Sequence, residues 1–466
     1  MSRQVDFVLA LSSFGERPAL CDDSGTSLSY TALTEAIDST TTAWRELIPV
    51  ERPLIMLECR QSITTVINYL TCLANQWPVM MVNEQVGTAA RDELRHRLPP
   101  HLVVTDTRCH AEHTAVHDMD PRLAVLLSTS GSTGGGKWVA LSHDNINANT
   151  TSILAYLPIA QEDNALASLP FSYSYGLSVL HTHLAKGAQL TLTQRSPMER
   201  DFWHLLSEAQ ITSLAGVPHW YEMLARLGFC RKAFPSLRYM TQAGGRLQSR
   251  FVKEFARYAD NHDMALYIMY GQTEATARMA YLSPDKALTK PEAIGQAIPG
   301  GEFALRDEAG ELVTCSGVAG ELCFKGKNVM LGYVHSVDDL ATFTPPDWLE
   351  TGDIACRDDE GDYHVVGRKA RFIKLFGERV NLDGLEGLLA NAGLDVKCYG
   401  QDNALTVCCL TGQASMAGEA VKAYVNCPPK AVRIAEVDAW PLLSNGKTDY
   451  RVLASCTASQ GEGAHD

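Results

Sequence analysis

The feature that most constrains this chain is a loop rich in glycine and hydroxyl side chains at residues 128–139, bounded by two short apolar segments. Residues 124–127 precede the loop and residues 138–141 end it, and each run has the length of a buried strand. Residues 142–145 then supply helix-capping side chains before the more helical segment 146–157. We therefore predict a strand, a loop and a second strand, and only then a helix.

The composition of the loop suits a polyphosphate. Its glycines allow main-chain N–H groups to converge on phosphate oxygens, its hydroxyls add donors, and Lys137 adds a positive charge. We expect the phosphates of a nucleotide to bind Lys137 and these loop residues: Thr129, Ser130, Gly131, Ser132, Thr133 and Gly134.

Gly131 to Lys137 also satisfies the first part of the Walker pattern, so a P-loop NTPase is an alternative. However, Trp138 stands where Walker chemistry needs a hydroxyl for Mg²⁺, and a strand follows where a helix is required. Both departures argue against a P-loop. A catalytically silent nucleotide-binding module is the other alternative outside ligase chemistry.

The length of 466 residues indicates two or more domains. Short apolar runs, such as residues 54–57 and 102–105, alternate with helical stretches, such as residues 200–210 and 250–258. This alternation predicts an α/β fold of parallel sheets covered by helices. From about Gly295 onward, turn residues separate short strands, which predicts hairpins or a small β-barrel.

The formal net charge of −14 disfavours sequence-independent binding of nucleic acid, because binding its phosphates requires clustered Lys and Arg. Charged side chains interrupt the N-terminal apolar residues, so we expect no signal peptide. No segment reaches the ~20 apolar residues of a membrane span. We expect a cytoplasmic protein without a nucleic-acid partner.

Further motifs follow the loop in a definite order, and the whole set resembles the adenylate-forming superfamily. That superfamily includes acyl-CoA synthetases, aryl acid ligases, luciferases and the adenylation domains of nonribosomal peptide synthetases. After residues 129–137, the matching motifs are Tyr270-Gly271-Gln272-Thr273-Glu274, Gly320-Glu321-Leu322, Gly332-Tyr333, Thr351-Gly352-Asp353, Gly367-Arg368 with Ile373-Lys374 and Gly377, and Asn445-Gly446-Lys447.

The resemblance implies a large N-terminal domain at residues 1–369, with two parallel-type β/α subdomains and a small β-barrel. A small mobile α/β domain at residues 370–466 would carry the catalytic lysine. Relatives usually have Asp or Lys at the hinge, whereas this chain has Ala370. The second half-reaction is therefore less well supported by the sequence than the first.

The resemblance also implies ATP and Mg²⁺ as cofactors. Lys137 and the loop would bind the β- and γ-phosphates, Glu274 would carry Mg²⁺, and Thr273 would donate to the α-phosphate. Lys447 would bridge the acid's carboxylate and the α-phosphate. The residues expected to bind the nucleotide are Gly244, Gly245, Tyr270, Gly271, Asp353 and Arg368. Of these, Arg368 would bind the ribose or lie near the hinge.

The acyl pocket is expected after the loop, where no Asp or Glu lies between Asp163 and Glu199 to meet a substrate ammonium. A simple carboxylic acid is therefore favoured over an amino acid. The candidate pocket residues are Tyr173, Tyr175, Gly176, His219 and Trp220. Core packing is an equal alternative for the aromatic ones. The segment His181-Thr182-His183 could offer two metal ligands from one face of a strand, but nothing nearby completes such a site.

The sequence thus predicts a ligase that forms an acyl-adenylate and passes the acyl group to CoA or to a carrier-protein phosphopantetheine. A stand-alone amino-acid adenylation enzyme and an amide-forming ligase are the alternatives within the superfamily.

Overall fold

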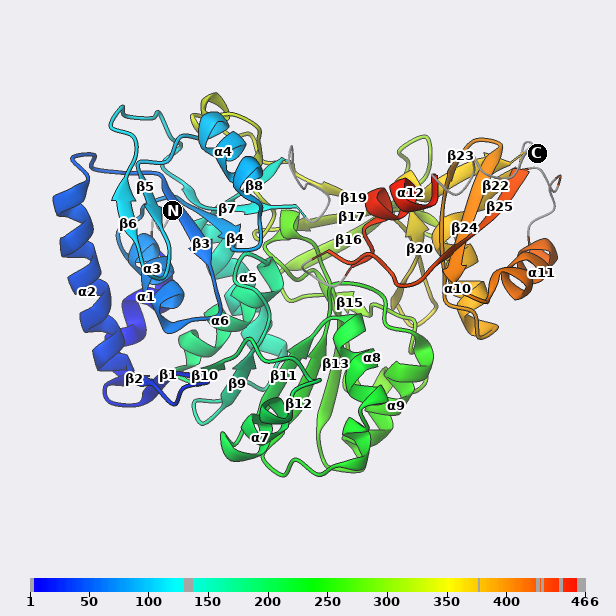
Figure 1. Cartoon of the computed structure of the whole chain (residues 1–466), viewed down its shortest axis with the longest axis horizontal. Helices are drawn as coiled ribbons and strands as arrows, with labels where there is room; N and C mark the ends of the chain where they lie inside the picture. The colour runs from blue at the N-terminus through cyan, green and yellow to red at the C-terminus, as the bar shows by residue number, and fades with distance from the viewer. Residues whose placement is uncertain are drawn as a thin grey trace. The chain divides into compact units, whose positions relative to one another are not determined.

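The computed structural model describes residues 4–129, 137–375, 378–424, 428, 431–443 and 447–458. The chain divides into two compact units (Figure 1). The first unit comprises Met1–Glu302 and Phe324–Leu349, and the second comprises Phe303–Cys323 and Glu350–Asp466. None of the helices in the described ranges is both long enough and apolar enough to cross a membrane.

A seven-stranded sheet of the first unit carries the predicted phosphate loop. Its strands, in spatial order, are β18 (Gly332–Val334), β8 (Trp138–Ser142), β7 (Leu123–Ser128), β4 (Val79–Asn83), β3 (Ile55–Cys59), β5 (Leu102–Val104) and β6 (Cys109–Ala111). The inner strands are parallel, whereas β7 and β8 are antiparallel neighbours that pair Ser128 with Trp138. The predicted strands before and after the loop are therefore confirmed.

Helix α5 (His143–Tyr156) begins where the capping residues predicted it. Ser142 Oγ accepts a hydrogen bond from Asn145 N (3.0 Å), and the Asn145 side chain accepts one from Ser142 N (2.8 Å). This capping box satisfies two backbone donors at the helix start. It fixes the direction of the chain immediately after the loop.

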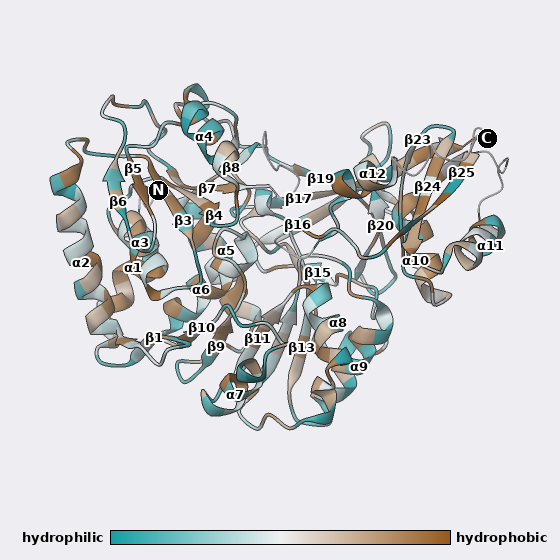
Figure 2. Cartoon of the chain, viewed as in Figure 1, coloured by the Kyte–Doolittle hydropathy of each residue, from teal (hydrophilic) through white to brown (hydrophobic). Residues whose placement is uncertain are grey.

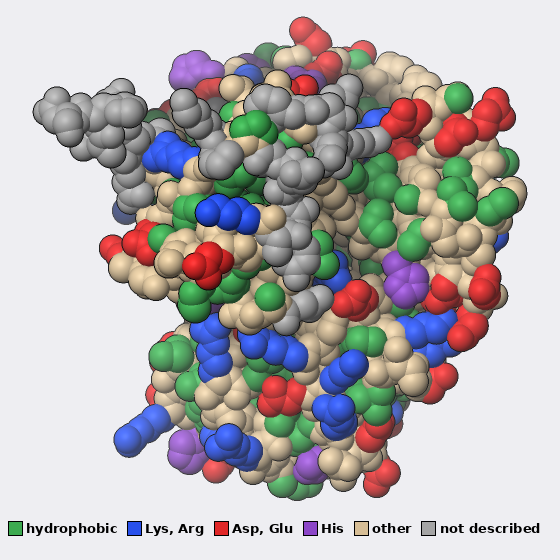
Figure 3. All heavy atoms as spheres, turned by 90° about the vertical axis from the view of Figure 1, so that its right-hand side faces the viewer, with side chains coloured by type: hydrophobic (Ala, Val, Ile, Leu, Met, Phe, Trp, Pro, Cys, Tyr) green, Lys and Arg blue, Asp and Glu red, His purple; other side chains and the backbone are tan. Residues whose placement is uncertain are grey.

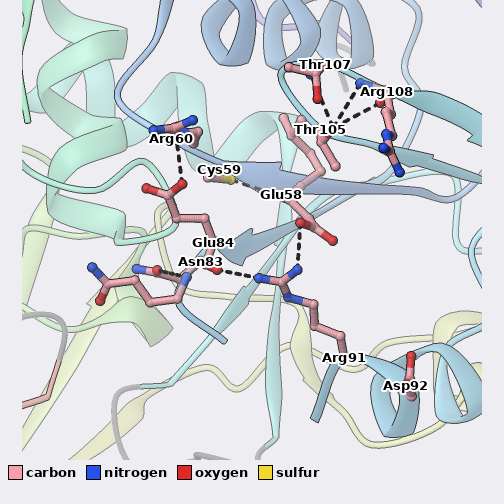
Figure 4. A network of polar contacts seen from close by, with 12 residues as sticks. Glu58, Cys59, Arg60, Asn83, Glu84, Arg91, Asp92, Thr105, Thr107 and Arg108 are labelled. Carbon is pink, nitrogen blue, oxygen red and sulfur yellow. Dashed lines mark hydrogen bonds and ion pairs between the residues drawn. The ribbon is translucent and has the colours of Figure 1, made fainter. Parts of the chain in front are cut away.

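The parallel strands of this sheet are apolar along almost their whole length, because helices cover both faces of a parallel sheet (Figure 2). Helices α3 (Ile63–Ala74) and α4 (Thr88–Arg97) belong to this sheet, and α2 (Tyr30–Leu47) packs against α3. Figure 4 shows how α4 is attached to the sheet: Arg91 Nη1 lies 2.9 Å from Glu58 Oε2 of β3, and Arg91 Nη2 donates to the carbonyl of Glu84. Arg60 Nε is paired with the Glu84 carboxylate at 2.9 Å.

A nine-stranded sheet forms the other half of the first unit. Its order is β15 (Gln296–Ala297), β14 (Ala280–Leu282), β13 (Ala265–Tyr270), β12 (Tyr239–Gln242), β11 (Ser213–Gly216), β9 (Asn164–Ala167), β10 (Gln189–Leu192), β1 (Pro18–Asp22) and β2 (Ser27–Ser29). Its strands from β13 to β1 are parallel. The associated helices are α1 (Asp6–Ala10), α6 (Ser174–Lys186), α7 (Arg200–Glu208), α8 (Pro218–Arg226) and α9 (Ser249–Asp260). Helices α7 and α9 occupy the stretches that the sequence predicted.

The second unit contains three small sheets. The region expected to form a barrel is a four-stranded sheet of β16 (Gly301–Arg306), β17 (Gly320–Gly326), β19 (Leu349–Arg357) and β20 (Tyr363–Arg368). The hairpin β21 (Phe372–Leu375) and β22 (Glu378–Asn381) follows, then the sheet of β23 (Val396–Gln401), β24 (Ala404–Leu410) and β25 (Val432–Val437). Helices α10 (Leu382–Asn391), α11 (Ala414–Tyr424) and α12 (Tyr450–Ala458) accompany that sheet.

The mixed α/β fold class is confirmed. A mobile C-terminal domain that begins at Ala370 stays a prediction. Short 3-10 helices connect several elements: η1 (Leu11–Phe14), η2 (Phe229–Arg231), η3 (Thr273–Ala275), η4 (Pro284–Lys286), η5 (Val337–Leu340) and η6 (Lys369–Arg371). On the face shown in Figure 3, basic side chains lie interspersed with acidic and hydrophobic ones.

Candidate functional site

Three side chains from distant segments meet beside the predicted phosphate loop. Lys137 directly precedes β8, and its Nζ lies 3.7 Å from the centroid of the Tyr333 ring. The Tyr333 hydroxyl in turn donates to Glu274 Oε1 at 3.0 Å. Strand β18 pairs with β8 and sets Tyr333 opposite Val139, which explains why residues 137 and 333 meet. The structure thus brings together the predicted phosphate lysine and the predicted metal carboxylate.

The Glu274 carboxylate has no cationic partner among the described residues, and a neutral hydroxyl is its side-chain contact. Burial, together with the nearby carboxylate, holds the pKa of Tyr333 above its ordinary value, so the hydroxyl remains a donor. A carboxylate oxygen is a favourable ligand for Mg²⁺. The surroundings of Glu274 therefore fit a divalent cation.

Thr273 and Glu274 lie in a strained segment that returns on itself. Thr276 and Ala277 have φ angles of +60° and +129°, which non-glycine residues rarely adopt. Asn328 holds the segment in place: its Nδ2 donates to Ala275 O (2.7 Å) and to Arg278 O (3.1 Å).

Gly271 is required by the same segment. A Cβ at this position would lie 1.8 Å from the carbonyl oxygen of Ala277, which no side chain can tolerate. We call residues 271–278 the arch. The close approach of the Ala277 carbonyl is sufficient to explain Gly271, without a ligand contact.

Gly244 and Tyr173, predicted for the base and the acyl pocket, lie together in the first unit. Gly244 has φ +87°, and a Cβ there would stand 2.5 Å from the Tyr173 hydroxyl oxygen and 3.1 Å from Val217 Cγ1. For Gly245, the nearest atom to such a Cβ would be Pro218 Cγ at 3.2 Å. Tyr270 ends β13, which pairs with the strand that leads to these glycines.

The remaining predicted pocket residues make core contacts. The buried Tyr175 hydroxyl donates to Thr241 O at 2.9 Å, and the Trp220 ring lies edge-on to Phe202 with centroids 6.0 Å apart. A Cβ on Gly176 would lie 2.4 Å from the carbonyl oxygen of Pro170. These contacts agree with the alternative of core packing, and a pocket role stays a prediction.

His219, the last predicted pocket residue, is exposed on α8. Of the predicted loop, Thr129 lies at the end of β7 and is half-buried. The other loop residues lie outside the described residues: Ser130, Gly131, Ser132, Thr133 and Gly134.

In the second unit, Asp353 and Arg368 face each other on paired strands. The two residues are register partners in β19 and β20, and Arg368 Nε lies 3.2 Å from Asp353 Oδ1. Asp353 is 5% exposed, and its backbone N–H donates to Thr351 Oγ1 at 3.1 Å. The predicted ribose acceptor is thus a nearly buried carboxylate with an exposed guanidinium at its edge.

Lys447 lies in a segment of the second unit that pairs antiparallel with residues 441–443. Leu443 N donates to Lys447 O (2.7 Å), and Asp449 N donates to Pro441 O (2.8 Å), so the two segments run antiparallel. Lys447 is half-buried. Asn445 and Gly446 lie outside the described residues.

The residues on either side of Ala370 form ion pairs with different parts of the second unit. Lys369 Nζ binds Glu321 Oε2 of β17 at 2.7 Å, whereas Arg371 Nη2 binds Glu386 Oε1 of α10 at 2.5 Å. Ala370 itself is exposed. The side chains before and after it are therefore bound to different elements, strand β17 and helix α10.

The His181 and His183 pair lies on α6, not on a strand, and its side chains are occupied. His181 Nε2 shares a hydrogen bond with Tyr69 Oη (2.8 Å), and His183 Nε2 shares one with Tyr239 Oη (3.0 Å). Burial lowers the pKa of His181 to about 3 and that of His183 to about 4. Within the described ranges, no group of three or more His, Cys, Asp and Glu side chains could hold a metal ion.

Sequence reasoning did not assign a role to three residues that shape this region. Tyr333 was part of a motif, but its contacts with Lys137 and Glu274 depend on strand pairing far along the chain. Asn328 and Arg278 were not singled out at all. A signal for Arg278 existed, since it is the one charge in the apolar run 275–282.

A family model of AMP-binding enzymes matches residues 103–334, which include the loop, the arch and Tyr333. Residues 103–334 form an AMP-binding enzyme domain. A 2-succinylbenzoate–CoA ligase of Bacillus cereus is 30% identical over 267 residues, which is 57% of this chain and 53% of the relative. An oxalate–CoA ligase of Arabidopsis thaliana is 25% identical over 349 residues, covering 71% of this chain and 67% of the relative.

Solved structures of adenylate-forming enzymes share the fold of this AMP-binding chain. The o-succinylbenzoate CoA synthetase of Bacillus subtilis with its acyl-adenylate intermediate matches with a TM-score of 0.78 and 20% identity, over 96% of this chain and 97% of that one. ATP-bound MatB of Rhodopseudomonas palustris matches with a TM-score of 0.81 and 19% identity, over 97% and 99%. The sequence match spans about half the length of the Bacillus cereus ligase.

Proposed function

We propose that this protein joins a carboxylic acid to ATP, which releases pyrophosphate and gives an acyl-adenylate, and then transfers the acyl group to a thiol of CoA or of a carrier-protein phosphopantetheine. The observation that carries the proposal is the meeting of Lys137 and Glu274 on either side of Tyr333, next to the loop. The relatives described above are acid–CoA ligases, which supports the same reaction class.

The first step needs electrostatic help, because an anionic carboxylate oxygen attacks an anionic α-phosphate. Lys137 would hold the β- and γ-phosphates, Thr273 would donate to the α-phosphate, and Lys447 would bridge the carboxylate and the α-phosphate. A Mg²⁺ ion held by Glu274 would neutralise charge on the departing pyrophosphate. Each of these residues would stabilise charge rather than form a covalent bond with the substrate.

Backbone, aromatic and charged groups would bind the adenosine. Gly244 and Gly245 leave room for the flat base, and Tyr270 supplies an aromatic face for it. Asp353 can accept hydrogen bonds from two ribose hydroxyls. Arg368, at the edge of that carboxylate, would bind the ribose or move with the hinge.

The second step would begin with a pivot at Ala370. The thiol then attacks the acyl carbonyl carbon, the thioester forms, and AMP leaves with the bonding electrons. Because Lys369 binds β17 and Arg371 binds α10, a change in backbone dihedrals at Ala370 would turn α10 and the sheet beside it against β17.

The alternative of a P-loop NTPase is not supported by the fold. Lys137 leads into strand β8, where a P-loop requires a helix. Trp138, which replaces the metal-binding hydroxyl, is 6% exposed and packs in the core of the seven-stranded sheet.

The proposal is tested by exchange of labelled pyrophosphate into ATP across fatty, aryl, cyclic and amino acids. We expect exchange to depend on an acid, and Lys447→Ala to lower it at least ~100-fold while ATP binding persists. The matched control is Lys422→Ala, which removes an exposed lysine from α11 and should leave exchange unchanged. Full exchange in the Lys447 variant would refute the catalytic role.

The acceptor is tested separately with CoA, a phosphopantetheinylated carrier protein and simple amines. Formation of a thioester and AMP supports transfer to a thiol. An amide product, or exchange with amino acids alone, would instead support one of the two alternatives within the superfamily.

A further inference from the structure

Arg278, at the end of the arch, is a buried cation without a counter-ion. Its side chain belongs to a residue that is 2% exposed, and among the described residues no carboxylate forms an ion pair with it. Its side-chain hydrogen-bond partners are neutral: the sulfur of Met269, 3.2 Å from Nη1, and the hydroxyl of Tyr156. Nε is buried and has no acceptor in the described part of the chain. A guanidinium has five N–H donors, so most of its capacity is unused.

The groups around Arg278 are neutral. Its guanidinium carbon lies 5.1 Å from the centroid of the Tyr175 ring, and the Tyr156 hydroxyl donates to the same Met269 sulfur at 3.3 Å. Burial and, more weakly, the charge of Arg278 lower the pKa of His183 to about 4, so that histidine is also neutral near pH 7. An uncompensated cation in such surroundings is unfavourable for folding.

The nearby carboxylate of Asp163 is already engaged. Both Asp163 and Arg278 influence the pKa of Tyr239, so the two charges share a neighbourhood. However, Asp163 Oδ1 is 2.5 Å from Arg238 Nη1, and Oδ2 accepts from Ala160 N at 2.7 Å. The chain therefore supplies this acid with its own partner and leaves Arg278 without one.

The position of Arg278 ties it to the proposed active site. The main-chain oxygen of Arg278 is held by Asn149 Nδ2 (3.0 Å) and Asn328 Nδ2 (3.1 Å), four residues after Glu274 on the strained arch. Its aromatic neighbour Tyr175 contacts Tyr173, with ring centroids 6.3 Å apart, and Tyr173 reaches Gly244. Arg278 thus lies behind the aromatic residues predicted for the acyl pocket.

We propose that Arg278 binds a second carboxylate of the acid, so that the substrates of this enzyme are dicarboxylic acids activated at one end. The proposal rests on the proposed function. A carboxylate offers two oxygens that match the guanidinium fork. Its charge-assisted hydrogen bonds would displace the weak contacts with the Met269 sulfur and the Tyr175 ring.

The test uses pairs of acids that differ only in the distal charge. Acid-dependent pyrophosphate exchange is measured with succinate, glutarate, adipate and phthalate, and with the monomethyl ester of each. We expect the preferred diacid to exceed its ester at least ~100-fold in kcat/KM, since removal of one charged, buried hydrogen-bonding partner has effects of that size.

Arg278→Met should lower kcat/KM for the diacid by about the same factor and leave that for the ester within ~3-fold of the wild type. Arg278→Lys should retain part of the preference, because it keeps a charge but loses the fork. Arg226→Met, which changes an exposed arginine of α8, is the control and should alter neither value. Circular dichroism and thermal melts establish that each variant is folded.

The outcomes separate the two proposals. If monoesters or other monocarboxylic acids are activated as well as diacids, or if Arg278→Met lowers both equally, Arg278 is a structural cation and the inference is wrong. If no acid of any class supports exchange, the proposed function itself fails.

Discussion

Two arginines, the half-buried Arg371 of the second unit and the buried Arg278 of the first, have opposite surroundings. Arg371 of the second unit is bound by Asp383 and by Glu386, and its guanidinium carbon lies 4.1 Å from the centroid of the Tyr450 ring. Arg278 of the first unit meets a thioether and an aromatic face. The first holds the fold together, and the second is left for a ligand.

Lys137 and Glu274 resemble Arg278 in this respect. Both contact the neutral Tyr333 side chain and not a group of opposite charge. Charges that stabilise a fold are paired by the chain itself. Charges that handle a substrate must remain available to it. The comparison can therefore be tested by removing one group from each side.

The largest effect is expected for Arg371→Met. It leaves Asp383 and Glu386 close together without their cation, and we expect a loss of about 3 kcal/mol in the unfolding free energy of the second unit. Hydrogen exchange of residues 382–410 would measure it. Adding Glu386→Gln should restore part of the loss in a double-mutant cycle. Unchanged protection in the single variant would contradict the structural role of Arg371.

Acid should weaken the first unit next, because the buried histidines of the described chain all lie there. His181 and His183 have folded pKa values of about 3 and about 4 against ~6.5 unfolded, so the stability they contribute is full above pH 6.5 and is lost as the pH falls toward 4. We expect each to remove about 2 kcal/mol between pH 7 and pH 5.

Urea unfolding at pH 7 and pH 5 would measure this loss. His183→Gln should reduce the difference between the two pH values, whereas His204→Gln, at an exposed position, should not. An equal pH dependence in all three proteins would argue that these histidines do not control acid stability.

A smaller effect is expected for Tyr333→Phe. The variant keeps the ring beside Lys137 but removes the hydroxyl that orients Glu274, so the Mg²⁺ concentration for half-maximal exchange should rise about tenfold. The matched control is Tyr267→Phe, since the Tyr267 hydroxyl has no hydrogen bond among the described residues. A purely structural Tyr333 would change the melting temperature and leave the Mg²⁺ requirement as it was.

The smallest effect on stability is expected for Arg278→Met. Replacing an uncompensated cation with an apolar side chain of similar length should leave the unfolding free energy within about 1 kcal/mol of the wild type, or raise it. Urea denaturation would show this directly beside Arg371→Met. A loss as large as that of Arg371→Met would remove the distinction between the two arginines.

Local sequence signals were sufficient for much of the fold. The strands before and after the loop, the capping box at Ser142 and the extents of α7 and α9 depend on periodicity and on neighbouring residues. The segment at His181 was considered as a strand, although Gly187 with φ +70° ends a helix there. A three-residue pattern was too short to distinguish the two.

The candidate site was less accessible to sequence reasoning, because its geometry comes from contacts across hundreds of residues. Motifs indicated Lys137 and Glu274, but strand β18 has to pair with β8 before Tyr333 can touch both. Arg278 shows the same limit. Its charge within an apolar run marks burial, whereas the absence of a counter-ion becomes visible only when its neighbours are known.

The arch also has a geometric consequence for the choice of acid. Thr273 and Arg278 belong to one backbone segment whose shape is set by Asn328 and by the tight approach of Gly271 to Ala277. The distance between the α-phosphate contact of Thr273 and the distal-carboxylate contact of Arg278 is therefore fixed by this segment. The arch would therefore select among diacids by their length as well as by their charge.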